Sequence, residues 1–208
     1  MNLQDQYNNY YPKLEKLQLF MVGDLRRTSQ KAQANFLVAL GVFNYIEILG
    51  SFYKYRNKYK VRGMRDKQGG IPRFDFAINY LFDSSYKMVF SSIKRIFGKP
   101  PYDMFRSGMS HEYLVKTYKG QTNNTISFTV VNPNNEVGYE RIVSREPCGI
   151  KIEKSGRRNY KIIIYCPKLI EDFNNAFEKY KQNLINNNGK FRDHFIHRAK
   201  YINLDLMV

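Results

Sequence analysis

Hydrophobic residues recur at helical spacing through the first half of the chain. An apolar stripe follows Pro12, a residue that suits the first turn of a helix, at Leu14, Leu17, Met21 and Leu25. The segment from about 31 to 55 is apolar around most of its circumference, so we expect it to be the central and most buried helix. Gly41 and Gly50 lower its helix propensity, which favours a role in the close packing of a neighbouring helix.

Two further helices are predicted in this half. A break at 69–72 (Gly-Gly-Ile-Pro) precedes a third helical stripe at Phe74, Ala77, Leu81, Tyr86 and Val89. A second break at 98–101 (Gly-Lys-Pro-Pro) precedes a fourth helix, which is expected from about 102 to 118.

In the second half of the chain, segments with alternating apolar and polar residues replace the helical spacing. ISFTVV (126–131) alternates like a strand, and GIKIE (149–153) and YKIIIYC (160–166) predict a β-hairpin. Pro167 then opens a helix, and a last short helix is expected from 191 to about 201. The apolar stripe of the helix after Pro167 consists of Leu169, Ile170, Phe173, Phe177 and Tyr180.

Together these elements predict a mainly α fold, an antiparallel helical bundle with a small β insertion before its C-terminal helices. We assign the bundle to residues 1–120, the insertion to 121–166, and the C-terminal helices, packed on the bundle, to 167–208. The length of 208 residues suits one compact domain.

Cysteine content and hydropathy indicate the cellular compartment in which the protein is expected. Cys148 and Cys166 are too few for a disulfide framework or a four-cysteine zinc site. They could pair across the hairpin, but two reduced, half-buried thiols are the preferred interpretation. The chain starts without a secretory signal pattern, and its most apolar stretch, 36–43, is too short to span a bilayer. We therefore expect a soluble, cytoplasmic protein with no membrane partner.

The chain is strongly basic. Thirty-four Lys and Arg residues against eighteen Asp and Glu give a formal net charge of +16, which commonly indicates a polyanionic partner. In the segment 54–73 only Asp66 opposes eight basic residues, and tyrosines interleave with them. This segment could be a loop that its charge keeps solvated. We expect instead that it binds RNA, through Lys54, Arg56, Lys58, Lys60, Arg62, Arg65, Lys67 and Arg73.

Arg106 and His111 are the residues that we expect to carry chemistry. The chain has three histidines and no glycine-rich phosphate loop, G-x-S-x-G elbow or H-E-x-x-H sequence. The run RSGMSH (106–111) resembles the R-x4-6-H motif of the HEPN superfamily, whose domains are small bundles of four or five helices. YDMFRSGMSHEYLVK (102–116) and FNYIEILG (43–50) also resemble segments of a group of uncharacterised bacterial proteins about this long. The resemblance covers roughly residues 10–120.

The resemblance implies metal-independent RNA cleavage, without a cofactor, at a site shared by two protomers. His111 would transfer the proton, because an imidazole has an ordinary pKa of about 6.5. Arg106 would bind the charge that builds on the phosphorane, and the products would be a 2′,3′-cyclic phosphate and a 5′-hydroxyl. Ser107 stands where members often carry Asn, Asp or His, and it can still hydrogen-bond. Such enzymes often serve in toxin–antitoxin or antiviral defence systems, which adds an antitoxin or regulatory protein to the expected partners.

Geometry adds two further expectations. Residues five apart lie about 140° apart on a straight helix, so Arg106 and His111 do not share a face. HEPN proteins place two such motifs across a dimer cleft, so the resemblance implies a homodimer with a two-fold axis near the fourth helix. Asn44, Glu47 and Ser51 form a polar stripe inside the predicted bundle. The carboxylate of Glu47 needs a partner there, either Arg106 or an unrelated structural base.

A second match to the letter pattern lies near the C-terminus. RDHFIH (192–197) has Arg192 and His197 at the same spacing, with Asp193 after the arginine. The segment follows the hairpin, outside the predicted N-terminal bundle, so a basic amphipathic cap is the preferred interpretation. Asp193, His194 and His197 could also gather into a small metal cluster, but we do not expect a metal site there.

Two other functions stay open. A catalytically inactive HEPN-like module would bind RNA, a nucleotide or a partner protein through the basic segment, with Arg106 and His111 only binding phosphate or packing. A helical interaction protein without nucleic acid would have to use the net charge of +16 for solubility, which is more than solubility requires.

Overall fold

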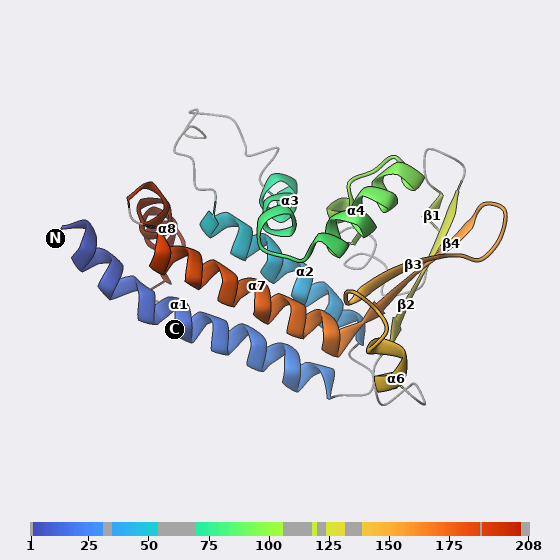
Figure 1. Cartoon of the computed structure of the whole chain (residues 1–208), viewed down its shortest axis with the longest axis horizontal. Coiled ribbons are helices and arrows are strands. Elements are labelled where there is room, and N and C mark those ends of the chain that lie inside the picture. Colours follow the sequence, from blue (N-terminus) through green and yellow to red (C-terminus); the bar gives the residue numbers. More distant parts are fainter. Residues whose placement is uncertain are drawn as a thin grey trace.

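The computed structural model describes residues 2–30, 35–53, 70–105, 118–119, 124–131, 139–187 and 189–204. These residues are mainly helical, with a small sheet at one end of the molecule (Figure 1). The predicted class, a mainly α chain with a small β insertion, is therefore confirmed. The HEPN-type arrangement of the bundle stays a prediction. No helix among the described residues has the length and apolar character that crossing a membrane needs.

The first helix, α1 (Leu3–Ser29), begins earlier than Pro12 suggests. The side chain of Asn2 accepts a hydrogen bond from the backbone N–H of Asp5 at 2.8 Å, and the Asp5 carboxylate accepts one from the backbone N–H of Asn2. This reciprocal capping box satisfies the free N–H groups at the start of a helix. Pro12 therefore lies inside the helix, and the expected start was wrong.

The second helix, α2 (Asn35–Tyr53), is the central helix that its apolar pattern predicts. It contacts α1, the helix α3 (Gly70–Tyr80) and both C-terminal helices. Its fully buried side chains include Val38, Val42, Phe43, Ile46, Leu49 and Phe52. Both glycines meet a neighbour closely: a Cβ at Gly50 would lie 1.9 Å from the carbonyl oxygen of Arg73, and one at Gly41 3.0 Å from Leu25 Cδ2. The predicted packing role of these glycines is confirmed.

The predicted third helix is two helices, α3 (Gly70–Tyr80) and α4 (Ser84–Phe97). Leu81 and Phe82 continue the apolar stripe, but Asp83 caps a new helix by accepting a hydrogen bond from the N–H of Ser85 at 2.8 Å. The helix α4 ends at Gly98, whose φ of +70° is the left-handed conformation that favours glycine. Residues 101–105 are helical again, and the rest of the predicted fourth helix lies almost wholly outside the described residues.

The sheet contains β1 (Tyr118–Lys119), β2 (Thr125–Val131), β3 (Ile150–Lys154) and β4 (Asn159–Tyr165) in the order β1-β2-β4-β3. The predicted hairpin is confirmed, because β3 and β4 pair antiparallel with Ile150 opposite Ile164. The strand β2 pairs parallel to β4, which local alternation does not reveal. A short helix, α6 (Tyr139–Val143), lies between β2 and β3 in sequence and was not predicted.

The C-terminal helices α7 (Cys166–Asn186) and α8 (Lys190–Tyr201) pack against α1 and α2. Pro167 lies in the first turn of α7, and the predicted apolar stripe of that helix is buried. Phe195, Ile196 and Ala199 of α8 are buried too, so the second R-x4-H match lies within the packed helices and not outside them. Cys148 and Cys166 are free thiols, as preferred from the sequence, but both are fully buried and not half-buried.

Candidate functional site

The main motif lies beyond the last described residue of its segment. Arg106, Ser107 and His111 are outside the described residues, which end here at Phe105. Phe105 is fully buried and stacks on Phe43 of α2 with ring centroids 4.2 Å apart. The residue before Arg106 is therefore anchored in the core. Also outside the described residues are the predicted RNA-binding residues Lys54, Arg56, Lys58, Lys60, Arg62, Arg65 and Lys67.

Arg73, the last residue of the basic segment, is described and contacts Glu47. Its Nη1 atom lies 3.9 Å from Glu47 Oε1, and the hydroxyl of Tyr102 donates a hydrogen bond to Glu47 Oε2. We call these three residues the Glu47 cluster. Arg73 is thus one base beside Glu47, and Arg106, the other partner expected from the sequence, lies outside the described residues.

The Glu47 cluster joins three separate segments of the chain. Glu47 lies on α2, Arg73 on α3 and Tyr102 in the helical turn 101–105. The backbone of Arg73 can approach α2 because Gly50, three residues after Glu47, has no side chain. Tyr102 is buried against Phe74 of α3, with ring centroids 5.3 Å apart. Sequence reasoning did not single out Tyr102, because a tyrosine after a Pro-Pro break is typical of an ordinary core position.

The polar stripe of α2 divides between two neighbours. Ser51 is buried and accepts a hydrogen bond from Nε of Arg198 on α8 at 2.8 Å, while its own hydroxyl donates to the carbonyl oxygen of Ile48. Glu47 contacts α3 instead, and Asn44 is half-buried. The structure thus does not bring the three predicted residues of the stripe into one site.

In the second motif, Arg192 and His197 contact different partners. Arg192 donates from Nε to the carbonyl oxygen of Leu184 at 2.9 Å and from Nη2 to that of Ile185 at 3.0 Å. Its guanidinium also lies 4.2 Å from the ring centroid of Tyr7. These contacts are typical of a cap on the last carbonyls of α7. His197 is exposed, and its Nε2 atom lies 3.3 Å from Oδ1 of Asp193.

In the part of the chain that the structure describes, neither this pair nor any other acidic, histidine or cysteine group suggests a metal. Across the described ranges, no three such side chains are placed so that they could hold an ion together. His194, which the sequence offered as a third ligand beside Asp193 and His197, is half-buried on α8.

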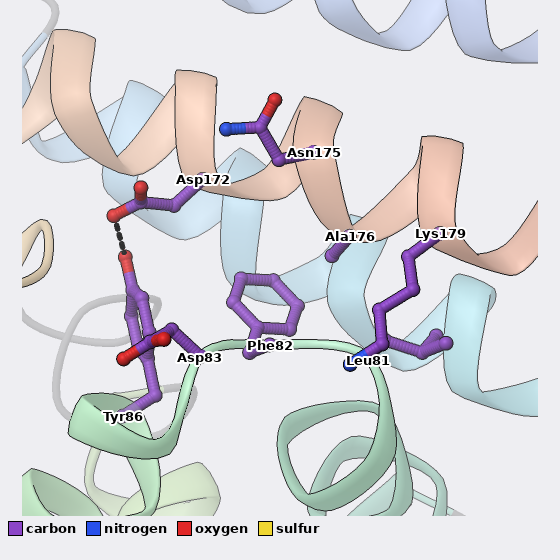
Figure 2. Close-up of a pocket in the computed structure, with 8 residues that line it drawn as sticks. All are labelled: Leu81, Phe82, Asp83, Tyr86, Asp172, Asn175, Ala176 and Lys179. Carbon is purple, nitrogen blue, oxygen red and sulfur yellow. Dashed lines mark hydrogen bonds between the residues drawn. The ribbon is translucent and has the colours of Figure 1, made fainter.

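A small cavity of about 260 Å³ lies between the α3–α4 connection and α7 (Figure 2). The hydroxyl of Tyr86 on α4 donates to Oδ2 of Asp172 on α7 at 2.6 Å, and the backbone N–H of Gly149 donates to the same oxygen at 2.9 Å. The cavity is lined by Leu81, Phe82, Asp83, Tyr86, Asp172, Asn175, Ala176 and Lys179.

Tyr86 and Asp172, two of the polar residues that line this cavity, are already hydrogen-bonded to each other. Burial raises the pKa of Asp172, although the hydrogen bond from Tyr86 and the nearby Lys168 ammonium oppose that shift. Burial raises the pKa of Tyr86 well above its ordinary value as well. Ligand pockets usually enclose about 300 Å³ or more, so the cavity falls below that range. We interpret the Tyr86–Asp172 pair as a structural contact between helices.

Comparison with known proteins adds no assignment. No family model matches the chain, and no curated protein or solved structure matches it either. The function must therefore be inferred from the motif, the charge and the Glu47 cluster.

Proposed function

We propose that this protein is a metal-independent endoribonuclease of HEPN type, in which Arg106 and His111 cleave RNA at a site shared by two protomers. The observation that carries the proposal is the Glu47 cluster. Tyr102 lies four residues before Arg106, and Arg73 is the last residue of the basic segment 54–73. Both contact the same carboxylate inside the bundle. The turn that precedes the motif and the last residue of the basic segment therefore meet at one carboxylate.

The cluster supports such a site in two ways. Glu47 and the core contacts of Phe105 hold the helical turn 101–105, so the chain enters the motif from a fixed position. The side chain of Arg73 stays 32% exposed beside Glu47. A guanidinium has five N–H donors, so Arg73 can bind a phosphate oxygen while it remains near the carboxylate.

The proposed reaction needs only groups of the chain and of the RNA. His111 takes the proton of a ribose 2′-hydroxyl, and the 2′-oxygen attacks the adjacent phosphorus. The bond to the 5′-oxygen breaks, and that oxygen receives a proton, which leaves a 2′,3′-cyclic phosphate and a 5′-hydroxyl. Arg106 donates hydrogen bonds to the phosphorane oxygens, where negative charge builds in the transition state.

Cleavage in the presence of EDTA tests the proposal. Purified protein is incubated with structured and single-stranded RNA, and wild type is compared with Arg106→Ala, His111→Ala and His197→Ala. We expect the first two variants to lose cleavage but keep RNA binding, and His197→Ala to remain active, because His197 lies on α8 beside Asp193. Equal cleavage by wild type and all three variants would refute the assignment.

Mixing inactive variants tests whether two protomers share the site. A heterodimer of Arg106→Ala and His111→Ala contains one intact arginine and one intact histidine on different chains. If the pair acts across the two-fold axis, the mixture should regain on the order of a quarter of wild-type activity, because half of the dimers carry one intact site. No recovery, or elution of the protein as a monomer, would contradict the shared site.

A biological role in toxin–antitoxin or antiviral defence is part of the same proposal. Expression of the wild-type chain should arrest bacterial growth, and expression of His111→Ala should not. Salt-sensitive RNA binding without any cleavage would instead assign the chain to the alternative, a catalytically inactive binding module.

A further inference from the structure

The turn of the β3–β4 hairpin carries basic side chains and projects away from the helices (Figure 1). From residue 154 to residue 168 the chain contains five basic residues and no acidic one. Four of these lie on the hairpin itself, and we call them the hairpin cations: Lys154, Arg157, Arg158 and Lys161.

Within the described part of the chain no hairpin cation forms a salt bridge, although Glu153 lies directly opposite Lys161 in the pairing of β3 with β4. Lys154, Arg157 and Arg158 are exposed, and Lys161 is half-buried. The nearest acidic residues are held by Lys151, whose Nζ atom lies 2.6 Å from Glu146 and 3.1 Å from Glu153. Hydrogen bonds to these two carboxylates raise the pKa of Lys151. One lysine is thus neutralised, and the positive charge at the end of the hairpin is not.

The framework under these cations is well fixed. The strand β4 pairs with β2 on one side and β3 on the other, and its side chains Ile162 and Ile164 are fully buried. Hydrogen bonds also close the turn: the N–H of Ser155 donates to the carbonyl of Asn159 at 2.9 Å, and the N–H of Thr125 to that of Arg158 at 2.8 Å. The backbone that carries the hairpin cations is therefore held in place by strand pairing and by hydrogen bonds.

The hairpin offers charge but no surface for base stacking. Its residues from 149 to 165 are all described, and none of its aromatic rings is exposed. Tyr160 is half-buried and packs edge-on against Phe97 of α4, with ring centroids 5.6 Å apart, and Tyr165 is buried. Guanidinium groups match the geometry of phosphate, whereas reading of single-stranded bases relies on exposed aromatic rings. The chemistry of the hairpin fits the phosphate backbone of a nucleic acid.

We propose that the β3–β4 hairpin is a second RNA contact, which binds the phosphate backbone independently of base sequence and away from Arg106 and His111. The inference rests on the proposed function in one respect only, that the polyanion is RNA. Phosphate contacts position a nucleic acid and supply salt-dependent affinity without sequence preference. The hairpin then strengthens binding of the substrate but takes no part in the chemical step.

The test compares two matched pairs of adjacent arginines. Arg157→Gln/Arg158→Gln removes two hairpin cations, and Arg26→Gln/Arg27→Gln removes two exposed arginines from the last turn of α1. All proteins carry His111→Ala, so that cleavage does not disturb binding. Affinity for a fluorescein-labelled RNA duplex is measured by anisotropy in EDTA at several KCl concentrations, and thermal melting checks that each variant folds.

We expect the hairpin variant to bind at least tenfold more weakly at 0.1 M KCl and the α1 variant to change less than threefold. The plot of log affinity against log salt has a negative slope, and its magnitude should be smaller by about 1.8 for the hairpin variant. Each lost duplex phosphate contact reduces this magnitude by about 0.9. Equal losses in both variants, or no loss in either, would overturn the proposal. So would hairpin-dependent binding to phosphatidylserine vesicles with unchanged RNA affinity.

The two proposals fail in different ways. If wild-type cleavage depends on His111 but the hairpin variant keeps its RNA affinity, the proposed enzyme is supported and the hairpin contact is overturned. Hairpin-dependent RNA binding without cleavage by wild type supports the contact and overturns the enzyme.

Discussion

Tyr86 joins three parts of the fold through one hydroxyl group. The residue lies on α4, its hydroxyl donates to Asp172 on α7, and it accepts a hydrogen bond from the N–H of Gly149 just before β3 at 3.1 Å. The side chain is almost completely buried. Since a buried polar group costs free energy unless it is hydrogen-bonded, this position tolerates a tyrosine only because its partners are in place.

Removal of this hydroxyl should destabilise the fold. Tyr86→Phe keeps the ring but takes one donor from the half-buried carboxylate of Asp172, so we expect the free energy of unfolding to fall by about 1–2 kcal/mol. Urea denaturation measures the change. Tyr80→Phe is the control, because Tyr80 is 52% exposed at the end of α3 and should change stability by less than about 0.5 kcal/mol. Equal effects of both variants would contradict the structural role of Tyr86.

The carboxylate of Asp172 should make stability depend on pH in a defined direction. Burial raises its pKa in the folded protein above the ordinary value of 3.8, so the folded state holds the proton more tightly than the unfolded state. Its contribution to stability therefore decreases as the pH rises from 3.8 through the raised folded-state pKa. Asp172→Asn can still accept the hydrogen bonds of Tyr86 and Gly149 but cannot ionise.

We expect Asp172→Asn to be at least as stable as wild type at pH 7, and to lose less stability than wild type between pH 4 and pH 7. Melting temperatures over that range are the measurement. A variant that is clearly less stable than wild type at pH 7 would mean that the charged form of Asp172 is favourable, against the direction of its pKa shift.

The contact between α2 and α3 depends on the missing side chain of Gly50. A Cβ there would lie 1.9 Å from a backbone oxygen of Arg73, and backbone cannot move aside as a flexible side chain can. Gly50→Ala should therefore separate the two helices and lower the free energy of unfolding by about 2–3 kcal/mol. It should also pull Arg73 from Glu47, and so reduce RNA cleavage if the proposed function is correct.

Gly41→Ala in the same helix is the matched control. The nearest atom to its added Cβ would be the end of the Leu25 side chain at 3.0 Å, which can rotate. The higher helix propensity of alanine, about 1 kcal/mol, would offset much of that contact. Urea denaturation of the two variants should separate them by at least about 2 kcal/mol. Similar stabilities would show that Gly50 does not set the distance between α2 and α3.

Local pattern predicts the elements of this chain better than their ends and partners. The apolar segment of α2, the hairpin and the stripe of α7 follow from periodicity, because each buries a face of its own. The break at Asp83 was missed because Leu81 and Phe82 continue the apolar stripe. The start of α1 was missed because Pro12 suits the first turn of a helix, whereas the capping box lies upstream of it. The parallel pairing of β2 with β4 joins distant segments, which local alternation cannot report.

The same limit applies to the candidate site. Glu47 was recognised as a carboxylate that needs a partner, since a polar residue on an apolar helix is visible in the sequence. Arg73 and Tyr102 were not identified as its partners, because their approach depends on how α3 and the turn 101–105 dock on α2. Sequence thus indicates which polar side chains need a partner, and tertiary packing decides which of them meet.

Among the described residues, five acidic side chains from separate parts of the fold make particular contacts. Glu47, Glu146 and Glu153 lie beside basic residues, Asp172 accepts from Tyr86 and Gly149, and Glu178 accepts from Gln18 at 2.7 Å. Burial raises the pKa of Glu178, but hydrogen bonds from Gln18 and Lys181 outweigh that effect and lower it. These carboxylates are thus occupied by local contacts, and the chain as a whole keeps a formal net charge of +16.

This excess should make the folded protein more stable when it is screened. With a net charge of +16, like charges repel more strongly in the compact state than in the unfolded chain. The screening length falls from about 30 Å at 0.01 M salt to about 10 Å at 0.1 M, so the melting temperature should rise as KCl increases over that range. RNA added at low salt should raise it further, because a ligand that binds only the folded state stabilises it by mass action.

The combined variant Arg26→Gln/Arg27→Gln/Arg157→Gln/Arg158→Gln tests whether repulsion causes the salt effect. It lowers the net charge by four through exposed side chains, so its melting temperature should start higher at 0.01 M KCl and rise less with added salt. A melting temperature that falls with KCl in wild type would mean that ion pairs such as Lys151 with Glu146 outweigh the repulsion. In that case ion pairs within the fold would compensate the positive charge. The net charge would then no longer support binding of a polyanion.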